Sequence, residues 1–489
     1  MSERRPPRTS AHELERYAGL FASRTRVMRS SAMRDLMAVT VRPEVISLAG
    51  GLPDTSTFDP ALFAALLGRL PSAAALQYGP SEGLAGVRDA IVKVMAAEDM
   101  AVDPDEVIVT TGGQQAIDLV TKTLIDPGDV VIAEAPTYPG AVPTFCSYEA
   151  EVIQIDVDSD GMSIDALEQT LLALDAARRR PKFIYTIPNF QNPAGVTMSL
   201  ERRRRLVEIA RERELIVLED NPYGMLRYEG EGLPTLRSLE APGPTDENDF
   251  VIYTGTMSKI LSPGVRVGWL VAPRPLLAKL ILGKQSTDLC SSTLAQHFVS
   301  EYFAAGDWRP YVASLCDLYH RRRDVILDAL AEQLPAAASW TRPQGGLFIW
   351  VTLPDYIGTT DLLARALAEN VAFVPGEAAY ADGRGQHAMR LNFSSSSDED
   401  IREGVRRIGK IVAEQVALYD TLTGHRGGPR AGSGERPAAD SPAAPASPAR
   451  QAPEPAQPPA AADAGGEGLA HILQLPRRGS LGGRRSREA

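Results

Sequence analysis

The sequence predicts an α/β protein: a large domain with a mostly parallel sheet between helices, and a smaller α/β domain built from the N- and C-terminal segments. Three observations support this prediction. Short apolar runs rich in Val and Ile recur through the middle of the chain, helix-like stretches separate most of them, and polar residues gather where the runs end. Continuous apolar strands that alternate with helices form a parallel sheet covered on both faces.

Six apolar runs are the expected strands of the large sheet. They are "EVIVTT" (106–111), "DVVIAEA" (129–135), "KFIYTIP" (182–188), "ELIVLED" (214–220), "FVIYTG" (250–255) and "VGWLVA" (267–272). Helices are expected in "QQAIDLVTKTLI", where Ile117, Val120 and Leu124 share one face, and in "LERRRRLVEIARER". After about Arg274 the pattern is mostly helical, and short strands return at "GGLFIWVTL", "VAFVPG" and "MRLNFS".

Pattern and composition divide the chain into five segments. We expect a disordered N-terminus at 1–20, a segment at 21–65 that joins the small domain, the large domain at 66–300, the C-terminal part of the small domain at 301–424, and a disordered tail at 425–489. The tail is rich in Pro, Ala, Gly and Ser, and it has too little bulky apolar surface to offset the entropy of ordering.

The overall composition excludes several classes of protein. The 489 residues are 44% hydrophobic and 23% charged, and the net charge of -11 argues against a nucleic-acid partner. Three distant cysteines, Cys146, Cys290 and Cys316, argue against a disulfide framework or a metal site and favour a reducing compartment. There is no signal-peptide pattern and no apolar stretch of the ~20 residues that a membrane helix needs. We therefore expect a cytoplasmic location and no membrane partner.

The first two strand exits each allow two interpretations. In "VIVTTGGQQAIDLV", Gly113 and Gln114 begin a helix directly after a strand. Free amides at a helix N-terminus favour a phosphate, although the same turn is also a common tight connection. In "VIAEAPTYPG", Tyr138 follows a strand between prolines; it could stack on a flat ring or pack on the domain rim.

The next two exits carry amide and carboxyl side chains. "TIPNFQNPAG" places Asn189 and Asn192 in a Pro-flanked loop, which is also ordinary turn chemistry. In "LIVLEDNPYG", Asp220 closes an apolar strand and Tyr223 follows within one turn. A carboxylate at the end of a buried strand needs a partner. A helix cap, an ion pair or the protonated ring nitrogen of a cofactor would each supply one.

The stretch "VIYTGTMSKILSPGVRVGWLVAP" (251–273) supplies a lysine. Lys259 follows a strand, close to the hydroxyls of Thr256 and Ser258 and to Arg266, which suits bidentate phosphate contact. A lysine in a partly desolvated, cation-rich pocket has a lowered pKa and can form a Schiff base with a carbonyl. Together with the four exits above, this set matches a pyridoxal phosphate site.

In combination, these motifs resemble a known family. "LAGGLPD", "QYGPSEGLAGVRDAI", "TTGGQQAIDL", "APTYPG", "IPNFQNPAG", "EDNPYG", "GTMSKILSPGVRVGW" and "MRLNFS" are similar to class I/II aminotransferases of the fold-type I pyridoxal phosphate superfamily. The resemblance runs from about Arg24 to about Val416 and is strongest to the subgroup of 2-aminoadipate and kynurenine aminotransferases. One departure is Gly113, where relatives often have Ser.

The resemblance implies a role for each motif residue. Lys259 would hold the cofactor as an internal aldimine and shuttle a proton, Asp220 would keep the ring nitrogen protonated, and Tyr138 would stack on the ring. Tyr223 and Asn192 would bond the phenolic oxygen. The phosphate would be held by Gly113, Gln114, Thr256, Ser258 and Arg266.

The resemblance also implies a dimer and a substrate grip. Tyr78 would reach the neighbouring subunit's phosphate in a homodimer. Arg390 would bind the substrate α-carboxylate, helped by Gly51 and Asn192. Arg34 would recognise a distal carboxylate of the substrate, as in glutamate. The alternative is that Arg34 is simply one of several arginines on the surface.

The expected reaction is transfer of an amino group between an L-amino acid and a 2-oxo acid, with 2-oxoglutarate and glutamate as one pair. Another enzyme of the same fold type, a β-lyase, decarboxylase or oxidase acting on an amino acid, would use the same cofactor residues. A ligand-sensing regulator is a second alternative, but only a short segment precedes "LAGGLPD" at Leu48 and the net charge is negative.

Overall fold

The computed structural model describes residues 17–28, 42–240 and 249–424. Arg34, most of the predicted disordered N-terminus and the whole predicted tail lie outside the described residues. Two compact units divide between Ala413 and Glu414, and every strand named below belongs to the first of them. The domain boundaries expected from the sequence stay a prediction.

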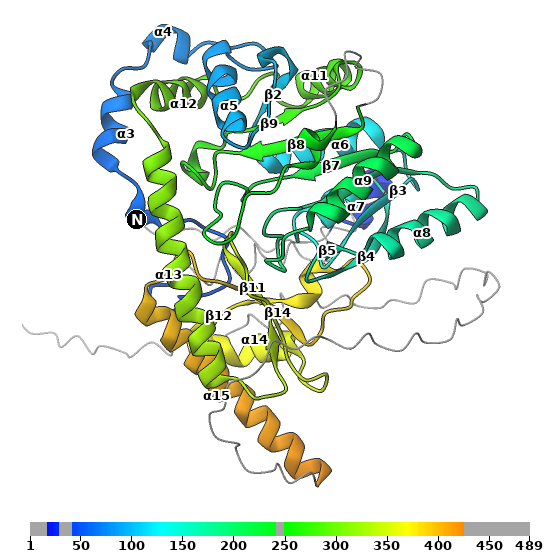
Figure 1. The fold of residues 1–489 in the computed structure, drawn as a ribbon, viewed down its shortest axis with the longest axis vertical. Coiled ribbons are helices and arrows are strands. Elements are labelled where there is room, and N and C mark those ends of the chain that lie inside the picture. Colours follow the sequence, from blue (N-terminus) through cyan, green and yellow to red (C-terminus); the bar gives the residue numbers. More distant parts are fainter. Residues whose placement is uncertain (1–16, 29–41, 241–248, 425–489) are drawn as a thin grey trace, which may run out of the picture. The chain divides into compact units, whose positions relative to one another are not determined.

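The large sheet has eight strands in the order β2-β9-β8-β7-β6-β3-β4-β5 (Figure 1). They are β2 (Val107–Thr110), β3 (Val130–Ala135), β4 (Glu151–Asp158), β5 (Gly161–Met162), β6 (Pro181–Thr186), β7 (Ile216–Asp220), β8 (Val251–Thr256) and β9 (Gly268–Val271). The pairs from β4 through β3, β6 and β7 to β8 are parallel. The antiparallel pairs of this sheet are those that involve β5 or β9, namely β4–β5, β8–β9 and β2–β9, so the mostly parallel sheet is confirmed.

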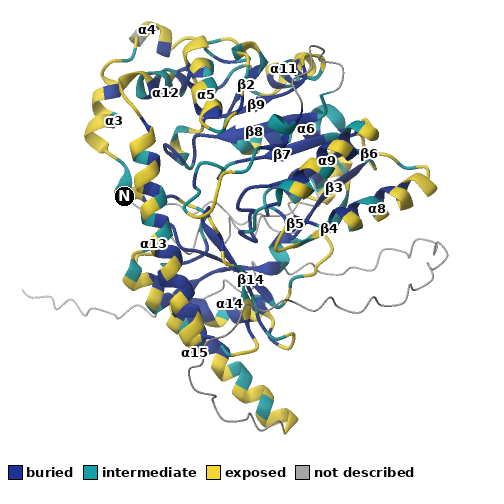
Figure 2. Cartoon of the chain, in the orientation of Figure 1, coloured by how far each residue is buried: buried dark blue, intermediate teal, exposed yellow. Residues whose placement is uncertain are grey.

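Helices cover both faces of this sheet (Figure 1). In this part of the chain they are α3 (Pro60–Leu67), α4 (Ser72–Ala75), α5 (Ala85–Ala96), α6 (Gly113–Leu124), α7 (Ala141–Ser147), α8 (Ile164–Ala176), α9 (Leu200–Glu212), α10 (Leu236–Leu239), α11 (Arg274–Asp288) and α12 (Thr293–Ala305). Val131 and Ala133 of β3 pack in a core with α6, α7 and α11, whereas Val130 and Ile132 pack with α8, α9 and α10. Because both faces are buried at β2, β3 and β6 to β9 (Figure 2), these strands are continuous apolar runs rather than alternating ones.

A second, antiparallel sheet follows later in the chain, in the order β10-β11-β14-β13. Its strands are β10 (Ser339–Trp340), β11 (Phe348–Thr352), β13 (Val374–Pro375) and β14 (Ala388–Asn392), and the helices here are α13 (Arg309–Gln333), α14 (Thr359–Ala368) and α15 (Asp398–Thr423). β1 (Ile46–Ser47) pairs in parallel with β12 (Val371–Ala372). This pairing joins the N-terminal segment to the C-terminal part of the chain.

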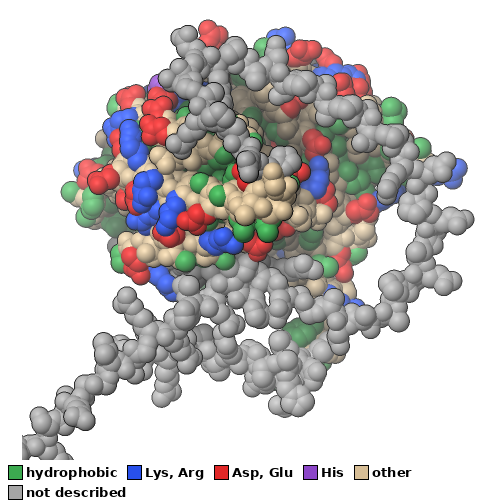
Figure 3. Space-filling view, turned by 90° about the horizontal axis from the view of Figure 1, so that it is seen from below, with side chains coloured by type: hydrophobic (Ala, Val, Ile, Leu, Met, Phe, Trp, Pro, Cys, Tyr) green, Lys and Arg blue, Asp and Glu red, His purple; other side chains and the backbone are tan. Residues whose placement is uncertain are grey.

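The short 3-10 helices are η1 (Ala18–Leu20), η2 (Ser23–Arg26), η3 (Thr55–Thr57), η4 (Pro104–Glu106), η6 (Pro263–Val265) and η7 (Gly376–Ala379). In the described part of the chain, no helix combines the length and the apolar character needed to cross a bilayer. No cluster of three or more His, Cys, Asp or Glu side chains among the described residues could hold a metal ion. On the face in Figure 3, acidic and basic side chains are interspersed rather than gathered by sign.

Candidate active site

The polar residues predicted at the strand exits follow the carboxyl ends of neighbouring strands. Asp220 ends β7, Lys259 lies three residues after β8, and Asn192 lies in the loop after β6 (Figure 1). Parallel strands that lie side by side present their carboxyl ends at one edge of the sheet, which is where open α/β sheets bind ligands. The hydrogen bonds and electrostatic couplings described next connect most of these residues.

Lys259 presents an amine in a partly buried, cation-rich position. Its Nζ donates a hydrogen bond to the carbonyl oxygen of Gly51 at 2.6 Å. Burial, and then the positive charges of Arg390 and Arg266, lower the pKa of Lys259 to about 8. The amine is therefore far more readily deprotonated than an exposed lysine, as a nucleophile that must attack a carbonyl requires.

Asp220 is a buried carboxylate whose described partner is a neutral hydroxyl. The Oη of Tyr185, from β6, donates to Asp220 Oδ2 at 2.7 Å. Burial raises the pKa of Asp220 to about 6, and the Tyr185 hydrogen bond opposes part of that rise. No lysine or arginine of the described chain forms an ion pair with this carboxylate. A protonated ring nitrogen would therefore supply the positively charged partner that a buried carboxylate needs.

Asn192 links the phenol of Tyr223 to the guanidinium of Arg390. Asn192 Nδ2 donates to Tyr223 Oη at 3.4 Å, and Arg390 Nη1 donates to Asn192 Oδ1 at 2.9 Å. Arg390 Nη2 donates to the Ala49 carbonyl at 2.7 Å. The expected help of Gly51 in substrate binding stays a prediction. The Phe348 ring lies 4.3 Å from the Arg390 guanidinium carbon and meets the Tyr223 ring edge-on. These contacts hold the guanidinium in one orientation.

The start of α6 and the segment after β8 form a cradle for an anion. The hydroxyls of Thr256 and Ser258 lie 2.8 Å apart. Gly112 has a φ of +78°, and a Cβ there would lie 2.5 Å from the Arg266 guanidinium. A Cβ on Gly113 would meet nothing within 4 Å. The helix N-terminus is therefore open in front of Gly113 and flanked by a cation, an arrangement that suits a phosphate.

Tyr138 lies near Asp220, and Gln114 holds it in place. Tyr138 Oη donates to Gln114 Oε1 at 3.2 Å, while Gln114 Nε2 donates to Thr144 Oγ1 at 2.7 Å. Burial raises the pKa of Tyr138, and the charge of Asp220 adds to the rise. The side chain of Gln114 is thus committed to Tyr138 and Thr144, which leaves its backbone amide as the group available to an anion.

The described contacts do not connect Tyr78 to this set. Tyr78 is 79% exposed, and its described hydrogen bond is that of its own backbone amide to Gln77. Tyr78 therefore has no described contact that places it at the site within a single copy of the chain. Arg34 lies outside the described residues.

The remaining residues fit pyridoxal phosphate by the chemistry of their groups. An open helix N-terminus with Arg266 suits the phosphate, and the unpaired carboxylate of Asp220 suits a protonated ring nitrogen. The hydroxyl and amide of Tyr223 and Asn192 suit a phenolic oxygen, and the amine of Lys259 suits an aldehyde.

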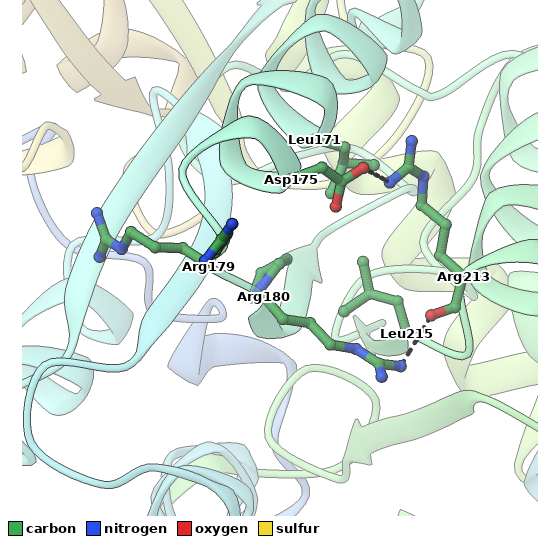
Figure 4. Close-up of a pocket in the computed structure, with 8 residues that line it drawn as sticks. Leu171, Asp175, Arg179, Arg180, Arg213 and Leu215 are labelled. Atoms are coloured by element: carbon green, nitrogen blue, oxygen red, sulfur yellow. Dashed lines mark hydrogen bonds and ion pairs between the residues drawn. The ribbon is translucent and has the colours of Figure 1, made fainter.

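A separate hollow of about 390 Å³ lies at the opposite, amino end of the strands. Arg180 and Arg213 line it together with the apolar side chains of Leu171 and Leu215 (Figure 4). Arg213 pairs with Asp175 at 2.7 Å, and Arg180 donates to the Arg213 carbonyl at 2.8 Å. None of the residues predicted from the strand exits lines this hollow.

Tyr185 and Phe348 were missed as site residues because both lie inside apolar runs that indicate core. For Tyr185 a signal did exist, since a tyrosine in a fully buried strand needs a partner for its hydroxyl. Phe348 had no such signal, because only the fold brings its ring against Arg390.

Comparison with known proteins gives a consistent result. A family model described as aminotransferase class I and II matches residues 43–408. Aromatic-amino-acid aminotransferase 1 of Thermococcus litoralis is 41% identical over 82% of this chain and 95% of its own length. The 2-aminoadipate transaminase of Thermus thermophilus is 39% identical over 80% of this chain and 96% of its own. The solved kynurenine aminotransferase of Pyrococcus horikoshii superposes with a TM-score of 0.77 at 39% identity, covering 83% of this chain and 98% of its own.

Proposed function

Because this chain belongs to the class I and II aminotransferases, a family of pyridoxal phosphate enzymes, we propose that it transfers the amino group of an L-amino acid to a 2-oxo acid, with glutamate and 2-oxoglutarate as one pair. The observation that carries the proposal is the environment of Lys259. Its amine has a pKa lowered to about 8 by burial and by Arg390 and Arg266. Arg390, one of the two arginines that lower this pKa, is buried and donates a hydrogen bond to Asn192. A cation that could bind a substrate carboxylate therefore lies close to the amine.

The residues that would hold the cofactor come from the ends of five strands, β2, β3, β6, β7 and β8. Arg266, the hydroxyls of Thr256 and Ser258, and the amides of Gly113 and Gln114 would hold the phosphate. Pyridoxal phosphate supplies an aldehyde that takes up the amino group and a ring that accepts the electrons left when Cα loses its proton. Asp220 would hold a proton on the ring nitrogen, and Tyr138 would cover one face of the ring.

Lys259 would serve twice in this proposal. Its Nζ would carry the cofactor covalently between turnovers, and it would then move the proton taken from the substrate Cα. Both roles need the neutral amine, and a pKa lowered to about 8 makes that form readily accessible near pH 8. Exclusion of water around this buried edge would keep the transferred proton at the site.

Arg390 would bind the α-carboxylate that every amino acid and every 2-oxo acid shares. Arg390 is 1% exposed, and its guanidinium is oriented by Asn192 and by the Ala49 carbonyl. A planar fork of this kind holds a carboxylate through two parallel hydrogen bonds. Arg390 therefore fixes the Cα end of either substrate and leaves the side chain to other residues.

A panel of L-amino acids, each incubated with the protein, pyridoxal phosphate and 2-oxoglutarate, tests the proposal. We expect glutamate to form with at least one amino acid and the corresponding 2-oxo acid to appear in equal amount. A panel that yields ammonia or carbon dioxide without glutamate would instead indicate lyase, oxidase or decarboxylase chemistry.

We further propose that the active form is a homodimer in which Tyr78 contacts the partner's phosphate site. Tyr78 and Leu76 are 79% and 80% exposed, which is unusual for two neighbouring apolar side chains in one copy of a chain and suits an interface. Light scattering should give the mass of a dimer, and Tyr78→Phe should weaken cofactor binding. A monomer with full activity would contradict this proposal.

A further inference from the structure

A buried carboxyl group with no role so far lies beside the site. Glu134, the last residue but one of β3, is 1% exposed. Its three described hydrogen-bond donors all come from the end of β6 and the loop after it. Thr186 Oγ1 donates to Oε1 at 2.5 Å, and Ile187 N and Gln191 Nε2 donate to Oε2 at 3.2 and 2.9 Å. Glu134 therefore ties strand β3 to the loop that carries Asn192.

Gln191 extends this connection in two directions. The same Nε2 that donates to Glu134 also donates to the Pro136 carbonyl at 2.7 Å. Its Oε1 accepts from the backbone amide of Ala194 at 2.7 Å. With both ends of its amide engaged and the side chain buried, Gln191 joins the loop that leads to Tyr138 to the loop that contains Asn192.

We propose that Glu134 and Gln191 are a pair of positioning residues that set Asn192 relative to Tyr138. Asn192 is the next residue after Gln191, and it orients Arg390 at 2.9 Å. A shift of the Asn192 loop would therefore move the guanidinium that grips the substrate carboxylate. This inference rests on the proposed function only for its effect on catalysis, because the loop geometry itself can be measured without turnover.

Glu219 provides a matched control for a purely structural effect. It is also a buried glutamate in the large sheet, and its carboxylate accepts from the backbone amides of Leu236 and Arg237, each at 2.9 Å. Burial raises the pKa of both Glu134 and Glu219 to about 7. The difference is that Glu219 holds α10, whereas Glu134 holds a loop of the site.

The chemistry of the hydrogen bonds distinguishes two substitutions at position 134. In Glu134→Gln the amide oxygen still accepts from Ile187 and Gln191, and its NH₂ faces Thr186, whose hydroxyl can turn to accept. Glu134→Met has a similar shape but no acceptor, and it leaves the Ile187 amide without a partner. The connection should therefore survive in Glu134→Gln and fail in Glu134→Met.

Hydrogen-exchange mass spectrometry on the full chain with pyridoxal phosphate bound, together with steady-state kinetics, tests the proposal. We expect Glu134→Met to speed exchange in peptides covering 187–196 and to lower kcat/KM about a hundredfold, mainly through KM. Glu134→Gln should keep near-wild-type values. Glu219→Met should speed exchange around Leu236–Leu239 and leave KM unchanged.

Gln191→Met removes the connection from the other side and guards against a variant at 134 that does not fold. It should reproduce the exchange pattern and the KM effect of Glu134→Met. The proposal is overturned if exchange in 187–196 is unchanged in Gln191→Met, or if exchange rises there while KM stays at the wild-type value in an active protein. If the variants change exchange as expected relative to wild type, but wild type transfers no amino group, the proposed function fails and the positioning of the loop stands.

Discussion

Replacing Asp220 by Asn should stabilise the protein without cofactor while it damages the site. The carboxylate of Asp220 is buried, and its described partner is the neutral hydroxyl of Tyr185. Asn has nearly the same shape, and its carbonyl oxygen can keep the Tyr185 hydrogen bond. The substitution therefore removes a buried charge and little else.

The pKa of Asp220 sets the size of the effect. A rise from 3.8 to about 6 corresponds to about 3 kcal/mol of lost stability at pH 7. The new NH₂ group of Asn has no acceptor among the contacts of Asp220, which costs about 1 kcal/mol. We expect Asp220→Asn to be more stable than wild type by about 2 kcal/mol at pH 7.

The pH dependence gives the sign of the effect. Between pH 3.8 and about 6 the folded state holds a proton on Asp220 that the unfolded state has lost. Wild-type stability therefore falls as pH rises through this window, relative to the variant, and the full penalty is present above it. Urea unfolding of the cofactor-free proteins at pH 4 to 8 should show an advantage of the variant that grows to about pH 6 and then levels off.

A variant that is less stable than wild type at pH 7, or an advantage that does not change with pH, would refute this reasoning. Added pyridoxal phosphate provides a second check. The cofactor should stabilise wild type more than Asp220→Asn, because only the carboxylate pairs with a protonated ring nitrogen.

Three further outcomes are expected. Gly112→Ala should weaken binding of pyridoxal phosphate in a fluorescence titration, because φ at this position is +78° and a Cβ would clash with the Arg266 guanidinium. Gly113→Ser is the control: its Cβ lies in open space, so this variant should bind the cofactor at least as well as wild type. Arg390→Lys should raise KM for the amino acid about tenfold in steady-state assays with little change in cofactor affinity, because lysine lacks the bidentate fork. Lys259→Met should abolish transamination. It should also stabilise the cofactor-free protein by about 3 kcal/mol at pH 7, because the pKa of the buried amine falls from 10.5 to about 8 on folding. In urea unfolding this gain should fade between pH 8 and 10.5, where the folded wild type has lost the proton that the unfolded chain still holds.

The strands that bury both faces were predictable from the sequence, and strand β4 was not found by the same criterion. All six continuous apolar runs are strands of the large sheet. β4, "EVIQIDVD", alternates apolar and polar residues and is only partly buried near the sheet edge, next to the two-residue β5. A search for period-two alternation would have found it.

The direction of a strand is a second feature that the apolar runs of the sequence do not predict. β9 follows β8 through a connection without an α-helix and runs antiparallel to it. An apolar run contains no information about direction, although the short connection does, because parallel neighbours need a longer crossover.

For the site, residues at strand exits were predicted and residues inside strands were not, although the buried hydroxyl of Tyr185 was a usable signal. Asp220 and Lys259 stand out because a charge next to an apolar run requires an explanation. Tyr185 and Glu134 lie within such runs, and their importance depends on which loop the fold places against them. That information comes from the order of the strands, which brings β3, β6 and β7 side by side.

Borohydride reduction of the protein with bound pyridoxal phosphate, followed by peptide mapping, tests the assignment of Lys259 most directly. The chain has seven lysines, and Lys284 is the most demanding internal control because it is also buried. Burial lowers the pKa of Lys284, and its pairing with Asp288 at 2.9 Å opposes that shift. The Lys284 Nζ also donates to Gln115 and Ser291, so its hydrogen-bonding positions are occupied, whereas the described partner of the Lys259 amine is one carbonyl. We expect the pyridoxyl mass on the peptide that contains Lys259 and on no other lysine peptide. A label on Lys284 or another lysine, or no label at all, would contradict the site described above.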